Sequence, residues 1–99
     1  TIGAITLNDK TKTVTVEGSP VSLTPTEYSI LKLLMEHPGK VYSTKALYES
    51  VWQEAALGSE GAVVVHIRHL REKIEINPSE PRYILVVWGQ GYKMEGGTR

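Results

Sequence analysis

Residues 63–74 read Val63-Val64-Val65-His66-Ile67-Arg68-His69-Leu70-Arg71-Glu72-Lys73-Ile74, which is the pattern of a helix with two unlike sides. Spacings of four, three and four place an apolar stripe on one side, which predicts packing into a core: Val63, Ile67, Leu70 and Ile74. The opposite side is expected to carry Ala62, Val65, Arg68, His69 and Glu72, with His66, Arg71 and Lys73 on the flanks.

Val65 is the informative residue of the polar side, because a solvated helix surface gains little from a β-branched apolar side chain. A helix in the major groove of DNA can use such a residue against a thymine methyl group, and Arg and His against phosphates and guanine edges. An ordinary amphipathic helix with one exposed valine explains this segment equally well. The segment alone therefore leaves both interpretations open.

The composition excludes several classes of protein. Ninety-nine residues suit one domain that buries a core of its own. The chain has no cysteine, so disulfides, thiolate catalysis and cysteine-ligated zinc are excluded. No apolar run approaches the roughly 20 residues that span a bilayer, and no signal peptide precedes the first strand-like segment. These features are typical of a cytoplasmic protein.

The formal net charge of zero argues against nucleic-acid binding, since domains that bind nucleic acids are usually basic. The distribution of charge is more favourable than its sum. Residues 66–73 hold three Lys or Arg residues and two histidines against one glutamate, while other acids gather elsewhere in the chain. We therefore expect binding of modest affinity with a strong dependence on salt.

The N-terminal part of the chain alternates in the manner of strands. Residues 4–7 and 12–16 predict two strands, joined by a polar turn at residues 8–10. Residues 18–20 predict a further turn, followed by a short extended stretch at residues 21–23.

Two helices are then indicated by their capping residues. Thr24 is the expected N-cap, with Pro25 at the first helical position and Glu27 completing a capping box. This helix should end at residues 37–39, and its buried face should comprise Tyr28, Leu31, Leu34 and Met35. A brief extended stretch precedes Ser43, the expected cap of a second helix that runs to about Trp52 and buries Ala46, Leu47 and Val51.

The remainder predicts a third helix and a hairpin. Ser59 can cap a helix over residues 60–76, which Asn77-Pro78 would stop. Strands over residues 83–88 and 92–95 flank the glycine-rich turn Gly89-Gln90-Gly91. The expected fold class is α+β: a winged helix-turn-helix with an N-terminal antiparallel sheet, three helices and a C-terminal β-hairpin wing. Residues 60–76 would be its recognition helix and residues 83–95 its wing.

Five phrases in order resemble the C-terminal effector domain of OmpR/PhoB-type response regulators, along nearly all of residues 1–99. They are residues 23–28, 37–43, 51–52, 65–71 and 87–92, of which Trp88-Gly89-Gln90-Gly91-Tyr92 and the helix phrase look most like Gram-positive regulators of the vancomycin-resistance type. The resemblance implies that the hairpin also pairs with the short strand between the first two helices. It further implies a phosphorylatable receiver domain N-terminal to Thr1.

The resemblance also implies contacts with double-stranded DNA, which we expect at Trp52, Ala62, Val65, His66, Arg68, His69, Arg71, Trp88, Gly89 and Tyr92. Gly61 and Ala62 replace a pair that often contacts phosphate in the family, and Trp88 stands where some members have a minor-groove arginine. Fewer donors are consistent with the neutral charge. The loop over residues 53–61 resembles a segment that meets RNA polymerase in relatives, which suggests Glu54, Leu57 and Glu60 as contacts.

Other roles for these residues stay open. Trp52 and Trp88 could instead serve packing, and Arg71 could pair with a carboxylate at the edge of the core. We expect no enzymatic activity, cofactor or metal site. The implied partners are promoter DNA with direct repeats, RNA polymerase and a sensor histidine kinase, and the full-length phosphorylated protein should dimerise although the domain alone is monomeric. The alternative function is a winged-helix module that binds protein, with weak or no DNA binding.

Overall fold

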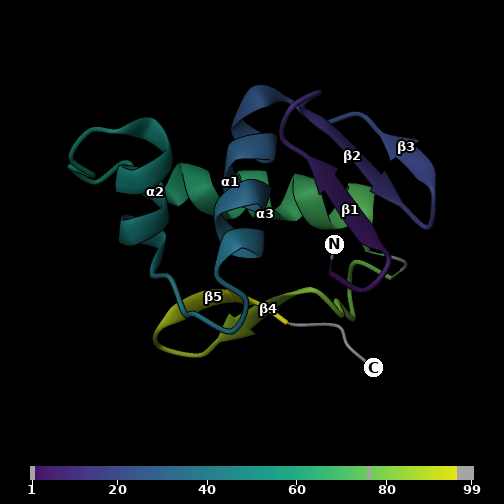
Figure 1. Cartoon of the computed structure of the whole chain (residues 1–99). Helices are drawn as coiled ribbons and strands as arrows, with labels where there is room; N and C mark the ends of the chain where they lie inside the picture. The colour runs from purple at the N-terminus through teal and green to yellow at the C-terminus, as the bar shows by residue number, and fades with distance from the viewer. Residues whose placement is uncertain (1, 76, 96–99) are drawn as a thin grey trace.

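The computed structural model describes residues 2–75 and 77–95, which form a small sheet, three helices and a hairpin (Figure 1). A three-stranded antiparallel sheet in the order β1-β2-β3 lies against α1, and the β4-β5 hairpin lies beneath the helices. The predicted α+β winged-helix architecture is therefore confirmed. The elements are β1 (Ile5–Asn8), β2 (Thr13–Val16), β3 (Ser19–Val21), α1 (Pro25–Glu36), α2 (Thr44–Trp52), α3 (Gly61–Ile74), β4 (Ile84–Val87) and β5 (Gly91–Met94).

The core lies where the three helices meet the sheet and the hairpin. α1 and α3 supply most of its fully buried side chains, because each helix has one apolar stripe. The sheet adds Ile5 and Val14 and the hairpin adds Ile84 and Met94. The fully buried helical residues are Ile30, Leu31, Leu34, Leu47, Val63, Ile67, Leu70 and Ile74.

The N-terminal sheet differs from the expected pattern at its third strand. Ser19 and Pro20, expected in a turn, lie in β3, where Ser19 pairs with Val16 and Pro20 with Thr15. The turn is tighter than expected because Glu17 and Gly18 both adopt positive φ angles, of 52° and 81°. The expected extended stretch was residues 21–23, but β3 ends at Val21, so residues 22 and 23 lie outside the strand.

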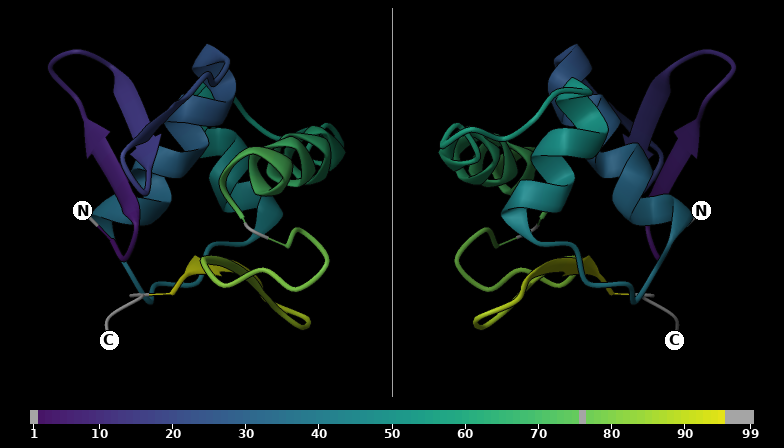
Figure 2. Two further views of the ribbon diagram at one scale, coloured as in Figure 1. Left: turned by 90° about the vertical axis from the view of Figure 1, so that its right-hand side faces the viewer. Right: turned by 90° about the vertical axis from the view of Figure 1, so that its left-hand side faces the viewer.

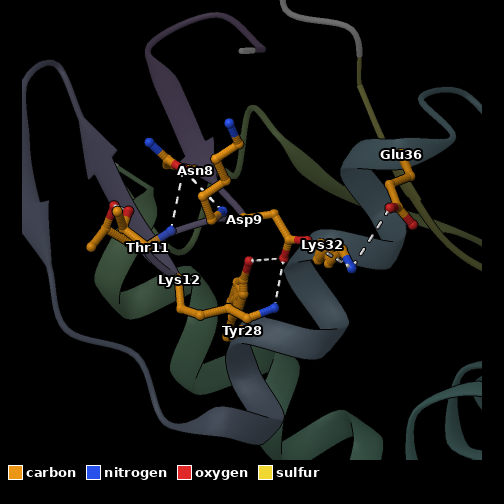
Figure 3. Close-up of polar contacts among 9 residues, drawn as sticks. Asn8, Asp9, Thr11, Lys12, Tyr28, Lys32 and Glu36 are labelled. Carbon is orange, nitrogen blue, oxygen red and sulfur yellow. Dashed lines mark hydrogen bonds and ion pairs between the residues drawn. The ribbon is translucent and has the colours of Figure 1, made fainter.

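The loop between β1 and β2 is tied to α1 by a polar cluster (Figure 3). The hydroxyl of Tyr28 donates a hydrogen bond to Asp9 Oδ1 at 2.6 Å, and Lys12 Nζ lies 3.0 Å from the same oxygen. Lys32 Nζ lies 3.5 Å from Asp9 Oδ2. The bond from Tyr28, together with the lysines, lowers the pKa of Asp9 to about 2, while burial and the neighbouring carboxylate raise that of Tyr28 to about 12. Tyr28, expected on the buried face of its helix, is half-buried.

The N-termini of α1 and α2 follow the expected capping. Thr24 Oγ1 accepts from the Glu27 amide, and the Glu27 carboxylate accepts from the Thr24 amide, which completes the predicted capping box. Ser43 caps α2 by accepting from the Ala46 amide at 3.0 Å. Leu47 is fully buried as expected, and Tyr48, not expected in the core, is buried beside it.

The ends of α3 correct the predicted range of 60–76. Glu60, not Ser59, occupies the N-cap position, and it makes no side-chain capping bond. At the other end the helix stops at Ile74, three residues before Asn77, and residue 76 lies outside the described residues. Glu75 is buried and extended, with ψ of 140°. Its carboxylate accepts from the backbone amides of Arg82, Tyr83 and Ile84, so a tertiary contact ends the helix before the Asn-Pro signal.

The hairpin turn is displaced by one residue from its expected place. Val87 pairs with Gly91, so the turn comprises Trp88, Gly89 and Gln90. Gly91 is the first residue of β5, where its φ is 144° and a Cβ atom would overlap the Tyr42 carbonyl oxygen. This close approach lets Tyr42 and Tyr92 exchange two backbone hydrogen bonds of 2.8 Å. The hairpin therefore pairs with the segment between α1 and α2, as the family resemblance implied.

Candidate nucleic-acid interface

The two sides of α3 are as the sequence predicts. Its apolar stripe is at most 2% exposed, while every residue of the polar side reaches solvent: Ala62, Val65, Arg68, His69 and Glu72. Val65 is 51% exposed, and Val64, its neighbour, is 47% exposed. Two opposite views, each turned by 90° from Figure 1, show α3 and the tip of the β4–β5 hairpin on the same side of the molecule (Figure 2). This side is the candidate interface.

Arg71, expected to contact DNA, is used inside the protein. Its Nε and Nη2 atoms donate to the Ile84 carbonyl oxygen at 3.2 and 2.9 Å. The guanidinium carbon also lies 5.6 Å from the centre of the Tyr92 ring. The alternative prediction placed Arg71 at the edge of the core paired with a carboxylate. Its acceptor is instead a backbone carbonyl oxygen. Arg71 and Tyr92 together join the recognition helix to the wing.

Lys73 is likewise turned toward the body of the domain. Its Nζ atom lies 2.6 Å from Glu27 Oε1, and Glu27 is only 2% exposed. His69 Nδ1 lies 3.8 Å from the other oxygen of the same carboxylate. Burial raises the pKa of Glu27, but the bonds from Lys73 and from the Thr24 amide outweigh it, so the pKa lies below its usual value. Glu27 was expected only as a capping residue; in fact it also connects α1 to α3.

Arg68 is the arginine of α3 that extends into solvent. Its side chain is 80% exposed, and its Nε lies 3.9 Å from Glu72 one turn later. An exposed pair at that distance is weak, so the guanidinium is free to exchange Glu72 for a phosphate or a guanine edge. His69 lies beside it on the helix, with a side chain that is 50% exposed. Arg68 and His69 are therefore the hydrogen-bonding side chains of the exposed face, and Val65 is its apolar one.

Trp52 and His66 lie together where α2 meets α3. The Trp52 ring stacks on Tyr48 with centroids 4.6 Å apart, and its centroid lies 5.6 Å from that of His66. Both Trp52 and His66 are half-buried. His66 Nδ1 is buried without a hydrogen-bond partner among the described residues. Trp52 thus packs within the domain, and it also lies against the ring of His66, a predicted DNA contact.

The tip of the wing is fully open. Trp88 is 90% exposed, which contradicts the alternative that it packs within the domain. Gly89 follows with φ of 77°, and no neighbouring atom lies where its Cβ would be. Val86, one pair below the turn, is 42% exposed. The wing therefore presents a large aromatic ring and accessible backbone rather than a cation.

The loop between α2 and α3 is ordered by hydrogen bonds to α2. Tyr48 donates to Glu54 Oε1 at 2.9 Å, and Glu49 Oε2 accepts from the Ala56 amide at 3.1 Å. Ala56 is buried, whereas Leu57 is 89% exposed. Glu60, expected as a surface contact, has Oε1 buried and without a hydrogen-bond partner among the described residues. The predicted polymerase contacts therefore separate into an exposed Leu57, an internally bonded Glu54 and a largely covered Glu60.

A helix with one exposed face, preceded by a helix and loop and flanked by a hairpin on the same side, defines a winged helix-turn-helix domain. The chain belongs to the family described as "Transcriptional regulatory protein, C terminal", whose model matches residues 18–94.

The curated relatives are longer regulatory proteins. A probable transcriptional regulatory protein of Picosynechococcus is 50% identical over 81% of this chain, and regulatory protein VanR of Enterococcus faecium is 41% identical over 92%. The chain spans 32% and 40% of these two proteins. Transcriptional regulatory protein ResD of Bacillus subtilis is 43% identical over 86% of the chain. Because these identities are similar, they do not place the chain nearer to the vancomycin-resistance regulators than to the other relatives.

Solved structures support the same assignment. The RstA DNA-binding domain of Klebsiella pneumoniae, crystallised with the RstA box, matches with a TM-score of 0.88 and 27% identity, covering 97% of this chain and 95% of that one. DrrB of Thermotoga maritima, described as an OmpR/PhoB homolog, matches with a TM-score of 0.86 and 34% identity, covering 95% and 42%. The resemblance to OmpR/PhoB-type effector domains is therefore confirmed.

Two further observations concern other kinds of site. No helix among the described residues is long and apolar enough to cross a membrane. Within residues 2–75 and 77–95, no three His, Asp or Glu side chains lie in a group that could hold a metal ion.

Proposed function

We propose that this chain is the DNA-binding effector domain of a two-component response regulator that controls transcription. α3 enters the major groove, and the β4–β5 wing rests on the backbone or in the minor groove. The observation that carries the proposal is the division of α3 into a buried stripe and a free face beside the wing tip. The RstA domain, which matches over nearly its whole length, was crystallised with its DNA box.

Within this proposal the predicted contact residues take different roles. Val65, Arg68 and His69 read base edges, because they share the free face of α3. His66 and Trp52 lie at the α2–α3 junction and meet the sugar-phosphate backbone, as do the backbone atoms of Ala62 and Gly89. Arg71 and Tyr92 act indirectly, by fixing the angle between α3 and the wing.

The whole protein extends this proposal beyond the chain. We propose a receiver domain N-terminal to Thr1, phosphorylated through a cognate sensor histidine kinase, whose phosphorylation brings two effector domains onto direct repeats in a promoter. The isolated domain is then a monomer, and the protein acts in the bacterial cytoplasm. The chain covers about a third of its Picosynechococcus relative, which leaves room for such a domain.

A second function is favoured by the α2–α3 loop. Leu57 is exposed on a loop that hydrogen bonds hold in place, and Glu54 lies nearby in sequence. An ordered apolar residue with an acidic neighbour suits contact with a protein such as RNA polymerase. The same loop would serve a winged helix that binds protein instead of DNA, which is the alternative function for the neutral chain.

A selection of bound duplexes from a random-sequence library tests DNA binding directly. The selected duplex and a scrambled duplex are then titrated with wild type, Val65→Asp and Ser22→Asp at several salt concentrations. Val65→Asp places a charge on the free face of α3, whereas Ser22→Asp adds the same charge in the exposed connection between β3 and α1. Binding that neutralises Z phosphates weakens with salt at a log–log slope of about −0.9Z.

We expect Val65→Asp to abolish the preference for the selected duplex while its circular dichroism spectrum and melting temperature stay close to wild type. Ser22→Asp should bind like wild type. Enrichment of no sequence, or equal binding by Val65→Asp and wild type, would contradict the proposal and favour the protein-binding module.

A further inference from the structure

His69 lies between a buried carboxylate and solvent. Its side chain is half-exposed on the free face of α3, and its Nδ1 atom lies 3.8 Å from Glu27 Oε2. Glu27 is only 2% exposed, and Lys73 Nζ lies 2.6 Å from its other carboxylate oxygen. One ring nitrogen of His69 therefore faces a buried negative charge, while the side chain stays accessible to a ligand of α3.

The elements packed against α3 meet it at different side chains. α1 brings the Glu27 carboxylate to His69, whereas α2 meets α3 at His66 and the hairpin meets it at Arg71. On α3 itself the charged neighbours of His69 in the sequence are Arg68, Glu72 and Lys73. Glu27 is thus the group from outside α3 that faces the imidazole.

The other charges around His69 cancel in pairs. Lys73 is paired with Glu27. Arg68 lies 3.9 Å from Glu72, so the formal charges of these two residues of the free face also sum to zero. The charge state of His69 therefore decides whether the free face of α3 carries a net positive charge.

The ionised Glu27 also determines which nitrogen of His69 holds a proton. Burial raises the pKa of Glu27, but bonds from Lys73 and from the Thr24 amide hold it below its usual value, so the carboxylate is ionised at neutral pH. A neutral imidazole has one N–H, and a carboxylate near Nδ1 favours the proton there. Nε2 is then an acceptor. It can donate to a phosphate or a guanine edge only after the ring gains a second proton.

We propose that His69 donates to DNA from Nε2 only as the imidazolium, and that Glu27 is the positioning residue that imposes this condition. This inference rests on the proposed function and adds regulation by pH to it. Histidine changes charge between about pH 5 and pH 8, so the affinity for duplex rises as the pH falls through that range. Arg68 and Val65 contribute at every pH in the range, because neither changes charge there.

Titration of the selected duplex at fixed salt, from about pH 8 to about pH 5.5, tests the proposal. Wild type should bind about tenfold more tightly at the acid end, which is the contribution of one hydrogen bond from a charged group. His69→Gln should lose this gain, and His69→Arg should bind tightly throughout. The matched control is His37→Gln, which removes an exposed histidine at the end of α1 and should behave as wild type.

Glu27→Gln separates positioning from stability. The new amide can donate to Nδ1, which moves the proton of the neutral ring to Nε2 and makes His69 a donor without a second proton. This variant should therefore bind more tightly than wild type near pH 8 and depend less on pH. Its Tm should fall, because Lys73 loses its charged partner. A purely structural Glu27 would instead weaken binding by one factor at every pH.

The ring nitrogens of His69 give a readout that needs no change at Glu27. Nitrogen NMR spectra distinguish a protonated from an unprotonated ring nitrogen, and comparison with His69→Gln assigns the signals. In free wild type near pH 8 the proton should reside on Nδ1. This measurement decides the role of Glu27 if Glu27→Gln does not fold.

The outcomes distinguish this inference from the proposed function. If wild type binds duplex and His69→Gln gains as much affinity at acid pH, the inference fails while the proposed function stands. A neutral ring protonated on Nε2 in wild type, or a Glu27→Gln variant weakened equally at every pH, has the same meaning. If wild type binds no duplex at any pH, both fail.

Discussion

Replacing Arg71 by alanine should destabilise the domain without changing the number of phosphates that it contacts. The guanidinium donates two hydrogen bonds to the Ile84 carbonyl and lies 5.6 Å from the Tyr92 ring centre. Hydrogen bonds from a charged group contribute about 1.5–3 kcal/mol, and a partly exposed cation–π contact adds about 0.5–1 kcal/mol. The two bonds share one acceptor and do not add in full, so we expect a loss of roughly 2–3 kcal/mol. For a domain of this size that loss lowers Tm by roughly 10–20 °C.

Arg68→Ala is the matched control, because it removes the same side chain from the same helix. Arg68 is 80% exposed and lies 3.9 Å from Glu72, so its loss should change stability by at most about 0.5 kcal/mol. Urea unfolding followed by circular dichroism measures both variants, and salt titration on the selected duplex measures the phosphates contacted. Arg71→Ala should lower the urea midpoint and leave the salt slope as in wild type, and Arg68→Ala should do the reverse.

The opposite pattern would refute this reasoning. If Arg71→Ala unfolds at the wild-type urea concentration and its salt slope falls by about 0.9, then Arg71 leaves Ile84 and meets phosphate, as the family resemblance implied. Arg71→Lys adds a finer test, since a lysine supplies a point charge but not the paired donors of a guanidinium. It should recover only part of the stability.

Three other predictions concern the rest of the fold. Because the pKa of Asp9 in the folded chain is lowered to about 2, its ionised form stabilises the fold above the unfolded value near 3.8, and this contribution is lost as the pH falls toward 2. The stability difference between wild type and Tyr28→Phe should therefore shrink over that range, and a difference independent of pH would contradict this. Gly91→Ala should unfold the domain because its Cβ meets the Tyr42 backbone, whereas Gln90→Glu should keep the Tm and weaken binding to all duplexes by a similar factor. Leu57→Ser should leave Tm and DNA affinity unchanged and reduce transcription from a reporter promoter, if the loop meets polymerase.

Local signals carried most of the fold. The stripe of α3 and the caps of α1 and α2 depend on residues at most four positions apart, so the sequence specifies them without knowledge of the tertiary structure. The free face of α3 follows from the same periodicity. For that reason Val65, Arg68 and His69 could be placed correctly on one surface before the structure was known.

Long-range contacts account for what could not be predicted. Arg71 and Lys73 were expected on the flanks of α3, but their bonds to the Ile84 carbonyl and to the Glu27 carboxylate depend on the tertiary structure and not on spacing along the chain. The end of α3 was set by Glu75, whose carboxylate accepts from backbone amides seven to nine positions along the chain. The exposure of Trp88 depended on a turn displaced by one residue, since its register is fixed by the pairing of Tyr92 with Tyr42.

The neutral net charge is therefore a poor measure of this surface. Two of the eleven acids, Glu27 and Glu75, are buried and serve as acceptors inside the fold, one for Lys73 and one for backbone amides. Because Lys73 is also withdrawn, these internal bonds remove charge of both signs from the exterior, and the free face of α3 retains Arg68 and His69 beside Glu72. A face that combines Arg68 and His69 with the apolar Val65 suits a ligand that offers both phosphates and apolar sugar and methyl groups, and DNA grooves offer all three.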